Sequence, residues 1–128
     1  MSTPETLTPD YARNMRILGH CDQGGRADGV QVMVSKGYAY VGHVFSGGFS
    51  VIDVCDPRSP RFVKHIAQPA RTWSQHLQTS GDLLLVVNMK DMLQDQKLSA
   101  GDYYSGSIGE KVDISGADRS YAAGMRVF

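Results

Sequence analysis

The feature that most constrains this chain is an internal repeat with a spacing of about 45 residues. Placing Gly37 on Asp82 superposes residues 38–41 on residues 83–86, and both segments are rich in residues that favour β-strands. A second, shorter match places residues 124–128 on residues 48–52 once an insertion after Asn88 is allowed. A repeat of this length is typical of four-stranded propeller blades, so the pattern predicts sheets built from successive units.

The first unit contains alternating strand and turn signals. Residues 38–41 follow a glycine turn, and residues 49–54 form a second apolar run that has apolar side chains on both of its faces. The sequence Asp56-Pro57-Arg58-Ser59-Pro60 then predicts a rigid turn, because Asp caps backbone N–H groups and proline fixes φ. Another strand is expected over residues 61–66.

Two motifs in this unit resemble a known repeat family. Gly-Tyr-Ala-Tyr-Val at 37–41 is followed by Gly-Phe-Ser-Val-Ile-Asp-Val-x-Asp-Pro-x-x-Pro at 48–60, which is similar to the repeat of the LVIVD-repeat β-propeller proteins. The resemblance covers one full repeat over residues 37–63 and a partial one over 82–128. It implies a propeller fold and implies no particular biochemical activity.

The expected fold class is all-β: a partial β-propeller of about two blades, each a four-stranded antiparallel sheet. A short helix is predicted inside a long insertion, because Met89, Met92 and Leu93 recur at helical spacing over residues 89–98. The apolar run 83–87 is expected to be the most buried segment, and residues 14–20 to form a short strand. The predicted boundaries are a flexible arm at 1–14 and an incomplete propeller at 15–128, with blade one at 30–66, blade two at 72–128 and the insertion at 89–123. Strands are predicted at 30–34, 38–42, 49–54, 61–66, 73–79 and 83–88.

The length of the chain suits one domain, although a propeller needs about four to eight blades. The strand signal at 125–128 also stops before the Asp-Pro turn that follows the first unit. We therefore expect the chain to be the N-terminal piece of a longer protein, whose remaining blades are its first partner. A complete small β-sandwich is the alternative.

Composition excludes several classes of function. The formal net charge is +0, which disfavours nucleic acid and anionic membranes as partners. The polar start of the chain has no secretory signal, and no apolar run is long enough to span a membrane. Cys21 and Cys55 fit no metal or redox spacing. A cytoplasmic location with reduced thiols is the simplest expectation.

Candidate binding residues come from polar positions shared by both repeats. His43 and Asn88 occupy equivalent repeat positions at the end of one apolar strand, and Gln31 and His76 occupy equivalent positions in another. Positions that serve only packing are apolar in both copies. Polar pairs inside apolar strands predict a polar channel mouth, because a buried polar group needs a partner. The candidate ligand-binding residues are His76, His43, Arg71, Trp73, Gln31 and Asn88, and His76 and His43 are the candidate metal ligands.

Two functions are compatible with this pattern. The first is a binding scaffold that holds a small molecule or a protein on its loop-bearing face. The alternative is a metal-dependent enzyme with its site at the mouth of the channel, because His, Asp and Arg are expected to converge there. The sequence specifies no catalytic residue and no cofactor, and fold analogy alone does not decide between the two.

Overall fold

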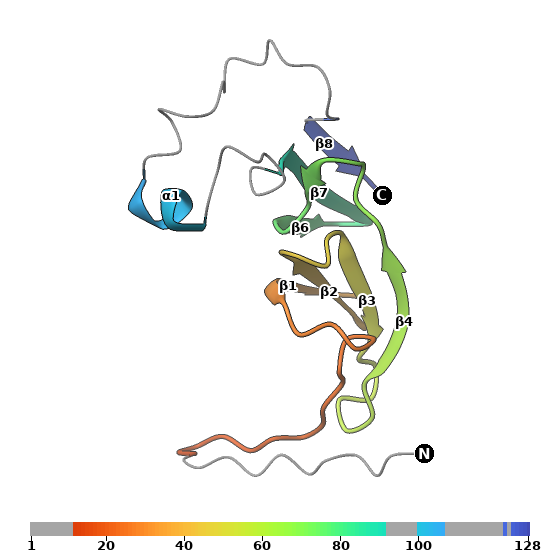
Figure 1. Ribbon diagram of the computed structural model, residues 1–128. Coiled ribbons are helices and arrows are strands. Elements are labelled where there is room, and N and C mark those ends of the chain that lie inside the picture. The colour runs from red at the N-terminus through yellow and green to blue at the C-terminus, as the bar shows by residue number, and fades with distance from the viewer. Residues whose placement is uncertain (1–11, 92–99, 107–121, 123) are drawn as a thin grey trace.

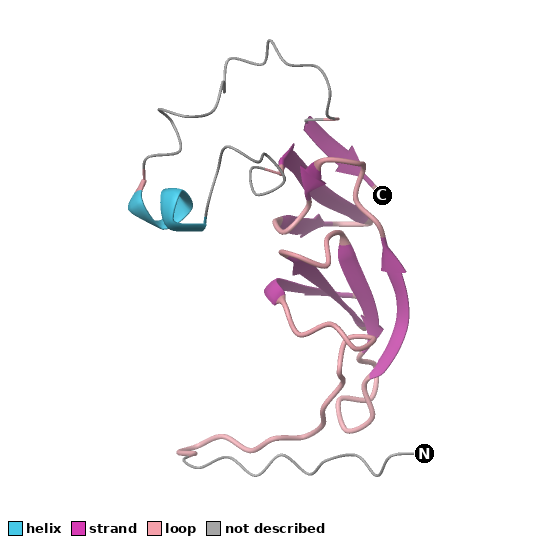
Figure 2. Ribbon diagram, viewed as in Figure 1, coloured by secondary structure: helices cyan, strands magenta, loops and turns pink. Residues whose placement is uncertain are grey.

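The computed structural model describes residues 12–91, 100–106, 122 and 124–128. Its strands form two antiparallel four-stranded sheets, which lie one above the other in Figure 1. We call them sheet one (β1–β4) and sheet two (β5–β8). The all-β prediction is therefore confirmed, and strands dominate the described chain in Figure 2.

Sheet one is a simple meander in which each strand pairs with the next, in the order β1-β2-β3-β4. Two-residue and longer turns connect its strands, and the turn at Lys36 and Gly37 has positive φ at both positions, as hairpin turns require. The predicted strands of blade one are confirmed to within one residue at each end. They are β1 (Gly29–Ser35), β2 (Tyr38–His43), β3 (Phe49–Asp53) and β4 (Arg61–Ile66).

Sheet two is built around β7, which pairs with all three of its other strands. The single strand predicted at 73–79 is wrong in one respect, because residues 74–76 interrupt it and leave two short strands that pair with different ends of β7. The strands of this sheet are β5 (Thr72–Trp73), β6 (Leu77–Ser80), β7 (Leu83–Lys90) and β8 (Gly124–Val127).

The two sheets repeat the same pairing register. Tyr40 lies opposite Val51 in sheet one, and their repeat equivalents Leu85 and Val127 lie opposite each other in sheet two. The same correspondence holds between β1 and β2 and between β6 and β7, where Val32 opposite Val41 matches Leu77 opposite Val86. The repeat seen in the sequence is therefore a repeat of structure, including the distant segment that forms β8.

The larger of two apolar clusters lies between the sheets. Phe49 from sheet one packs with Leu77, Leu84 and Val86 from sheet two, and all four side chains are buried. The ring of Phe128 meets that of Phe49 edge to face, with centroids 5.4 Å apart. Aliphatic and aromatic side chains at alternate positions supply this core, as expected for strands that bury one face.

The expectation that residues 83–87 form the most buried segment is wrong, because β3 is buried along more of its length than this part of β7. Leu84 and Val86 face the core, but Leu83 is 50% exposed and Val87 is 47% exposed. The physical reason is that only one face of sheet two packs against another sheet. Alternate residues of a strand point to opposite faces, so burial alternates along β7.

Two local predictions differ from the structure. Residues 14–20 form no strand, and they are exposed. The helix predicted over 89–98 is wrong at its start, because Met89 and Lys90 pair with β5 as part of β7. Residues 92–99 lie outside the described residues. The six-residue helix α1 (Ala100–Ser105) follows, and it is separate from both sheets in Figure 2.

The close approach of the sheets depends on Gly42. A Cβ atom at this position would collide with the backbone carbonyl of Gln75, which precedes β6. Backbone atoms yield less than flexible side chains, so the two sheets must separate if this position carries any side chain.

We expect Gly42→Ala to lower the free energy of unfolding by roughly 1–3 kcal/mol, a typical cost of overpacking. Urea unfolding followed by Trp73 fluorescence measures this change. Gln78→Ala, on an exposed position of β6, is the control and should change stability by less than about 0.5 kcal/mol. Equal stabilities of the Gly42→Ala and control variants would contradict the tight contact.

Candidate functional site

A buried chain of hydrogen bonds lies at the end of β2. The His43 Nδ1 atom is 3.0 Å from Asp28 Oδ1, and its Nε2 atom is 2.8 Å from the hydroxyl of Ser50 on β3. His43 and Ser50 are completely buried. Both ring nitrogens therefore have partners from the neighbouring strand and from the segment before β1, as buried polar groups require.

The same residues hold the loop between β2 and β3. Asp28 accepts hydrogen bonds from the backbone N–H and the hydroxyl of Ser46. The ring of His65 lies 2.7 Å from the carbonyl oxygen of Gly47, and Gln68 accepts from the N–H of Gly48. Three side chains from two separate segments thus fix one short loop, whose two glycines have positive φ.

Opposing effects set the charges of this group. Partial burial works to raise the pKa of Asp28, but the hydrogen bonds from Ser46 outweigh it and lower that pKa to about 2. Burial lowers the pKa of His43 below its ordinary value, and the nearby carboxylate of Asp28 opposes this shift without reversing it. At neutral pH the pair is therefore an ionised aspartate and a neutral imidazole, with the Nδ1–H donating to Asp28.

Sheet two carries a different polar group at the equivalent positions. Asn88 corresponds to His43, and its Oδ1 accepts hydrogen bonds from Ser74 at 2.8 Å and from Nε of Arg126 at 3.2 Å. Arg126, which corresponds to Ser50, also donates to the carbonyl of Ala67 at 3.0 Å. Each repeat therefore satisfies its buried polar pair with its own partners.

Sequence reasoning did not include Ser50, Ser74 or Arg126 among the candidate site residues. The signal that could have identified two of them is the second repeat match, which places Ser50 on Arg126, a polar residue in both copies of an apolar strand. Asp28 is harder to identify, because it lies outside every predicted strand and reaches His43 only through the fold.

The linked Asp28, His43 and Ser50 have the residue types and hydrogen-bond order of a catalytic triad. A catalytic serine must reach a substrate, whereas the Ser50 side chain is completely buried between sheet and loop. Its hydroxyl also lies 3.4 Å from the backbone carbonyl oxygen of Gln23, so a second protein group covers it. The arrangement is built to hold the loop and the N-terminal segment against sheet one.

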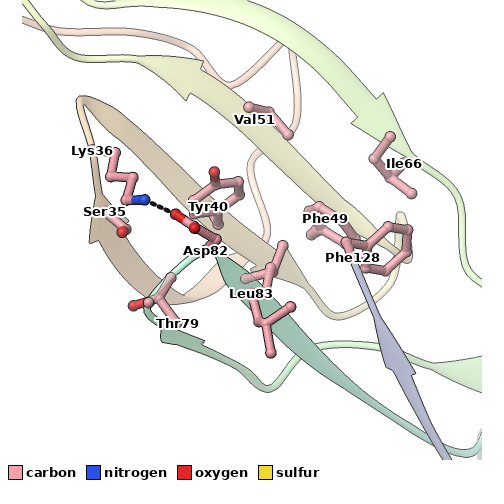
Figure 3. Close-up of a pocket in the computed structure, with 12 residues that line it drawn as sticks. Ser35, Lys36, Tyr40, Phe49, Val51, Ile66, Thr79, Asp82, Leu83 and Phe128 are labelled. Atoms are coloured by element: carbon pink, nitrogen blue, oxygen red, sulfur yellow. Dashed lines mark ion pairs between the residues drawn. The ribbon is translucent and has the colours of Figure 1, made fainter.

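A separate cavity of about 280 Å³ lies between the two sheets. Its walls are mostly apolar, and Figure 3 shows Phe49 and Phe128 together at one side with Lys36 and Asp82 paired at the other. The ion pair joins the β1–β2 turn to the β6–β7 turn and is largely exposed. The lining residues are Ser35, Lys36, Tyr40, Phe49, Val51, Ile66, Thr79, Gly81, Asp82, Leu83, Leu84 and Phe128.

The other predicted site residues lie in several environments. Gln31 links the sheets, since its side-chain oxygen accepts a hydrogen bond of 2.7 Å from the N–H of Leu77. Trp73 is buried in sheet two, whereas His76 and Arg71 are exposed. The carbonyl of Arg71 accepts from the N–H of Asp91. His43 and Asn88 use their polar atoms within the protein, and a ligand role for His76 stays a prediction.

The part of the chain that the structure describes contains no group of three His, Cys, Asp or Glu residues placed to hold a metal ion. Both ring nitrogens of His43 form hydrogen bonds within the protein, and among the described residues neither His43 nor His76 belongs to such a group. Among the described helices, none has the length and apolar character needed to cross a membrane.

Comparison with known proteins identifies one unit of this structure. Residues 24–67 match the model of the LVIVD repeat, so the chain carries an LVIVD repeat, as the sequence motifs predict. The match spans sheet one. It includes Asp28 and His65, whose side chains form hydrogen bonds with the β2–β3 loop. No curated protein and no solved structure matches the chain.

The lowered pKa of His43 predicts how the stability of the fold changes with pH. Its pKa is lower in the folded state than its unfolded value of about 6.5, so the unfolded chain binds more protons below that pH. Stability is therefore complete above about pH 6.5 and falls as the pH drops toward the folded-state pKa. We expect a lower midpoint of thermal unfolding at about pH 5 than at about pH 7.5, measured by circular dichroism.

A matched pair of variants isolates this effect. His43→Gln removes the titrating group, so it should lower stability at about pH 7.5 by roughly 1–3 kcal/mol and flatten the pH dependence. His20→Gln changes an exposed histidine and should retain the wild-type profile. If the His43→Gln protein kept the wild-type slope between these pH values, His43 would not be its source.

Proposed function

We propose that the two sheets are adjacent blades of a propeller-type scaffold that binds a small, mostly apolar molecule in the cavity between them. The LVIVD repeat supports the scaffold part of this proposal. The cavity between the sheets carries the binding part, because it is concave, largely apolar and edged by a few polar groups, as ligand sites usually are.

The polar groups at the cavity favour a ligand without net charge. Lys36 and Asp82 pair with each other, so neither presents an unbalanced charge to a bound molecule. Ser35 and Thr79 add hydroxyl groups at the same end, opposite the aromatic rings. A ligand with a short alkyl chain and a terminal hydroxyl group matches a cavity that is apolar at one end and polar at the other.

Binding fits the structure better than hydrolysis by the Asp28, His43 and Ser50 group. The hydroxyl of Ser50 is completely buried, and exposing it to a substrate would break its hydrogen bond to His43. The cavity, in contrast, opens to solvent beside exposed turns, so a ligand can enter without breaking either sheet.

The proposal predicts selective binding of a neutral amphiphile. We expect hexan-1-ol to bind more tightly than hexanoate or hexylamine, because a charged head group has no unpaired opposite charge to meet at the cavity mouth. Saturation-transfer NMR with the three compounds measures the order. The volume of about 280 Å³ lies just below the usual range for drug-sized ligands, so millimolar affinity is sufficient.

Two substitutions on β6 provide the control. Thr79→Phe places a ring in the cavity and should abolish binding of hexan-1-ol. Gln78→Phe adds the same ring at an exposed neighbour and should leave binding unchanged. Equal binding by both variants, or no preference for the neutral compound in the wild type, would show that the cavity is not the site.

A further inference from the structure

Tyr40 lies in the middle of β2, and its ring takes part in the packing between the two sheets. The residue is half-buried and packs against the apolar cluster that contains Phe49, Leu84 and Val86. Its backbone lies opposite Val51 of β3. This packing accounts for the ring of Tyr40, but it gives no role to the hydroxyl group at the end of the ring.

The repeat indicates that this position does not require a hydroxyl group. Leu85 is the equivalent residue in sheet two. It lies opposite Val127, as Tyr40 lies opposite Val51. A wholly apolar side chain therefore occupies the same place in the second unit with the same strand pairing. The hydroxyl group is a feature of sheet one alone, and the strand pairing of the repeat does not explain it.

The Tyr40 hydroxyl forms no hydrogen bond with the described residues. Asp82 lies at the same end of the cavity in Figure 3, but its carboxylate pairs with Lys36. A tyrosine hydroxyl beside an apolar core usually has a partner, because an unpaired polar group costs free energy in such a place. The protein itself supplies no such partner within the part of the chain that the structure describes.

The same hydroxyl group is accessible from the cavity between the sheets. Among the described residues, the fully buried side-chain atoms without a partner are Oε1 of Gln23 and Nε of Arg26, and the Tyr40 hydroxyl is not one of them. Tyr40 lines the cavity of about 280 Å³. A molecule in this cavity can therefore contact the hydroxyl oxygen.

We propose that Tyr40 selects and orients the ligand of this cavity by donating a hydrogen bond to an oxygen atom of the bound molecule. The inference rests on the proposed function, because it concerns the same cavity. It narrows the ligand class to neutral molecules with a hydrogen-bond acceptor at one end and an alkyl group at the other. Figure 3 shows Tyr40 near Lys36 and Asp82, and Phe49 and Phe128 together at the far side, so the alkyl group lies against these two rings.

The chemistry of a phenol determines the direction of this hydrogen bond. A phenolic O–H is a stronger donor than the O–H of Ser35 or Thr79, which line the same cavity, because the aromatic ring withdraws electron density from the oxygen. The ligand must therefore carry an acceptor, such as a carbonyl, ether or hydroxyl oxygen. A ketone, which accepts hydrogen bonds and donates none, should bind as an alcohol of similar size does.

Removal of the hydroxyl group tests this role. Tyr40→Phe keeps the ring that packs on the core and deletes only the donor. We expect this variant to bind hexan-2-one and hexan-1-ol about 2- to 12-fold more weakly than the wild type, the usual effect of losing one neutral hydrogen bond. The affinity for toluene, which has a similar size and no oxygen, should be unchanged. Titrations followed by backbone amide NMR shifts measure the three dissociation constants.

Tyr38→Phe is the matched control. Tyr38 lies on the same strand as Tyr40, but it is not one of the residues that line the cavity. The substitution deletes the same atom, so the affinities for all three probes should stay at their wild-type values. Circular dichroism of both variants should match that of the wild type, because each loses a single oxygen atom.

The infrared spectrum of bound hexan-2-one reports the contact directly. A hydrogen bond to a carbonyl oxygen weakens the C=O bond and lowers its stretching frequency. We expect a lower frequency for the ketone bound to the wild type and to Tyr38→Phe than for the ketone bound to Tyr40→Phe. A role of Tyr40 in packing alone would leave the three frequencies equal, and this result would overturn the proposal.

The binding results also separate this proposal from the proposed function. If Thr79→Phe abolishes binding of hexan-1-ol but Tyr40→Phe binds the ketone as tightly as the wild type, the cavity is a binding site and Tyr40 does not select its ligand. An equal loss of affinity for all three probes in Tyr40→Phe would show damage to packing and would refute the role as well. A wild-type protein that binds none of the probes would overturn both proposals.

Discussion

The structure depends on the packing of sheet one against sheet two through Phe49, Leu77, Leu84 and Val86. Burial of such a side chain stabilises a fold by about 1.5–3 kcal/mol, and these residues come from three different strands. The contact requires the two backbones to approach closely, and Gly42 permits this because it has no Cβ to meet the carbonyl of Gln75. A small apolar cluster thus determines both the distance between the sheets and the cavity at their edge.

Buried polar residues near this core occupy equivalent positions in the two repeats, but their hydrogen-bond partners differ. His43 uses Asp28 and Ser50, while Asn88 uses Ser74 and Arg126. Both repeats bury a polar side chain at this position, and each offsets the cost of burial with hydrogen bonds to its own partners. This explains how a group with the composition of a catalytic triad can be part of the scaffold: its serine faces the interior of the protein.

The repeat also accounts for what each sheet leaves exposed. A unit presents one face to the preceding unit and the opposite face to the following one, so within the described residues the face of sheet two that is turned away from sheet one stays uncovered. Leu83, Val87, Met125 and Val127 mark this face.

The sequence by itself determined the all-β class, the strands of sheet one, the repeat and the distant match that forms β8, because glycine turns and alternating apolar residues act locally. It also identified His43 and Asn88 as equivalent polar positions. Only the tertiary structure decided their role, since Asp28 and Arg126 reach them across turns and an insertion that no local pattern encodes. The same holds for burial along β7, because alternation specifies two faces of a strand, and the presence of a neighbouring sheet decides which face is covered.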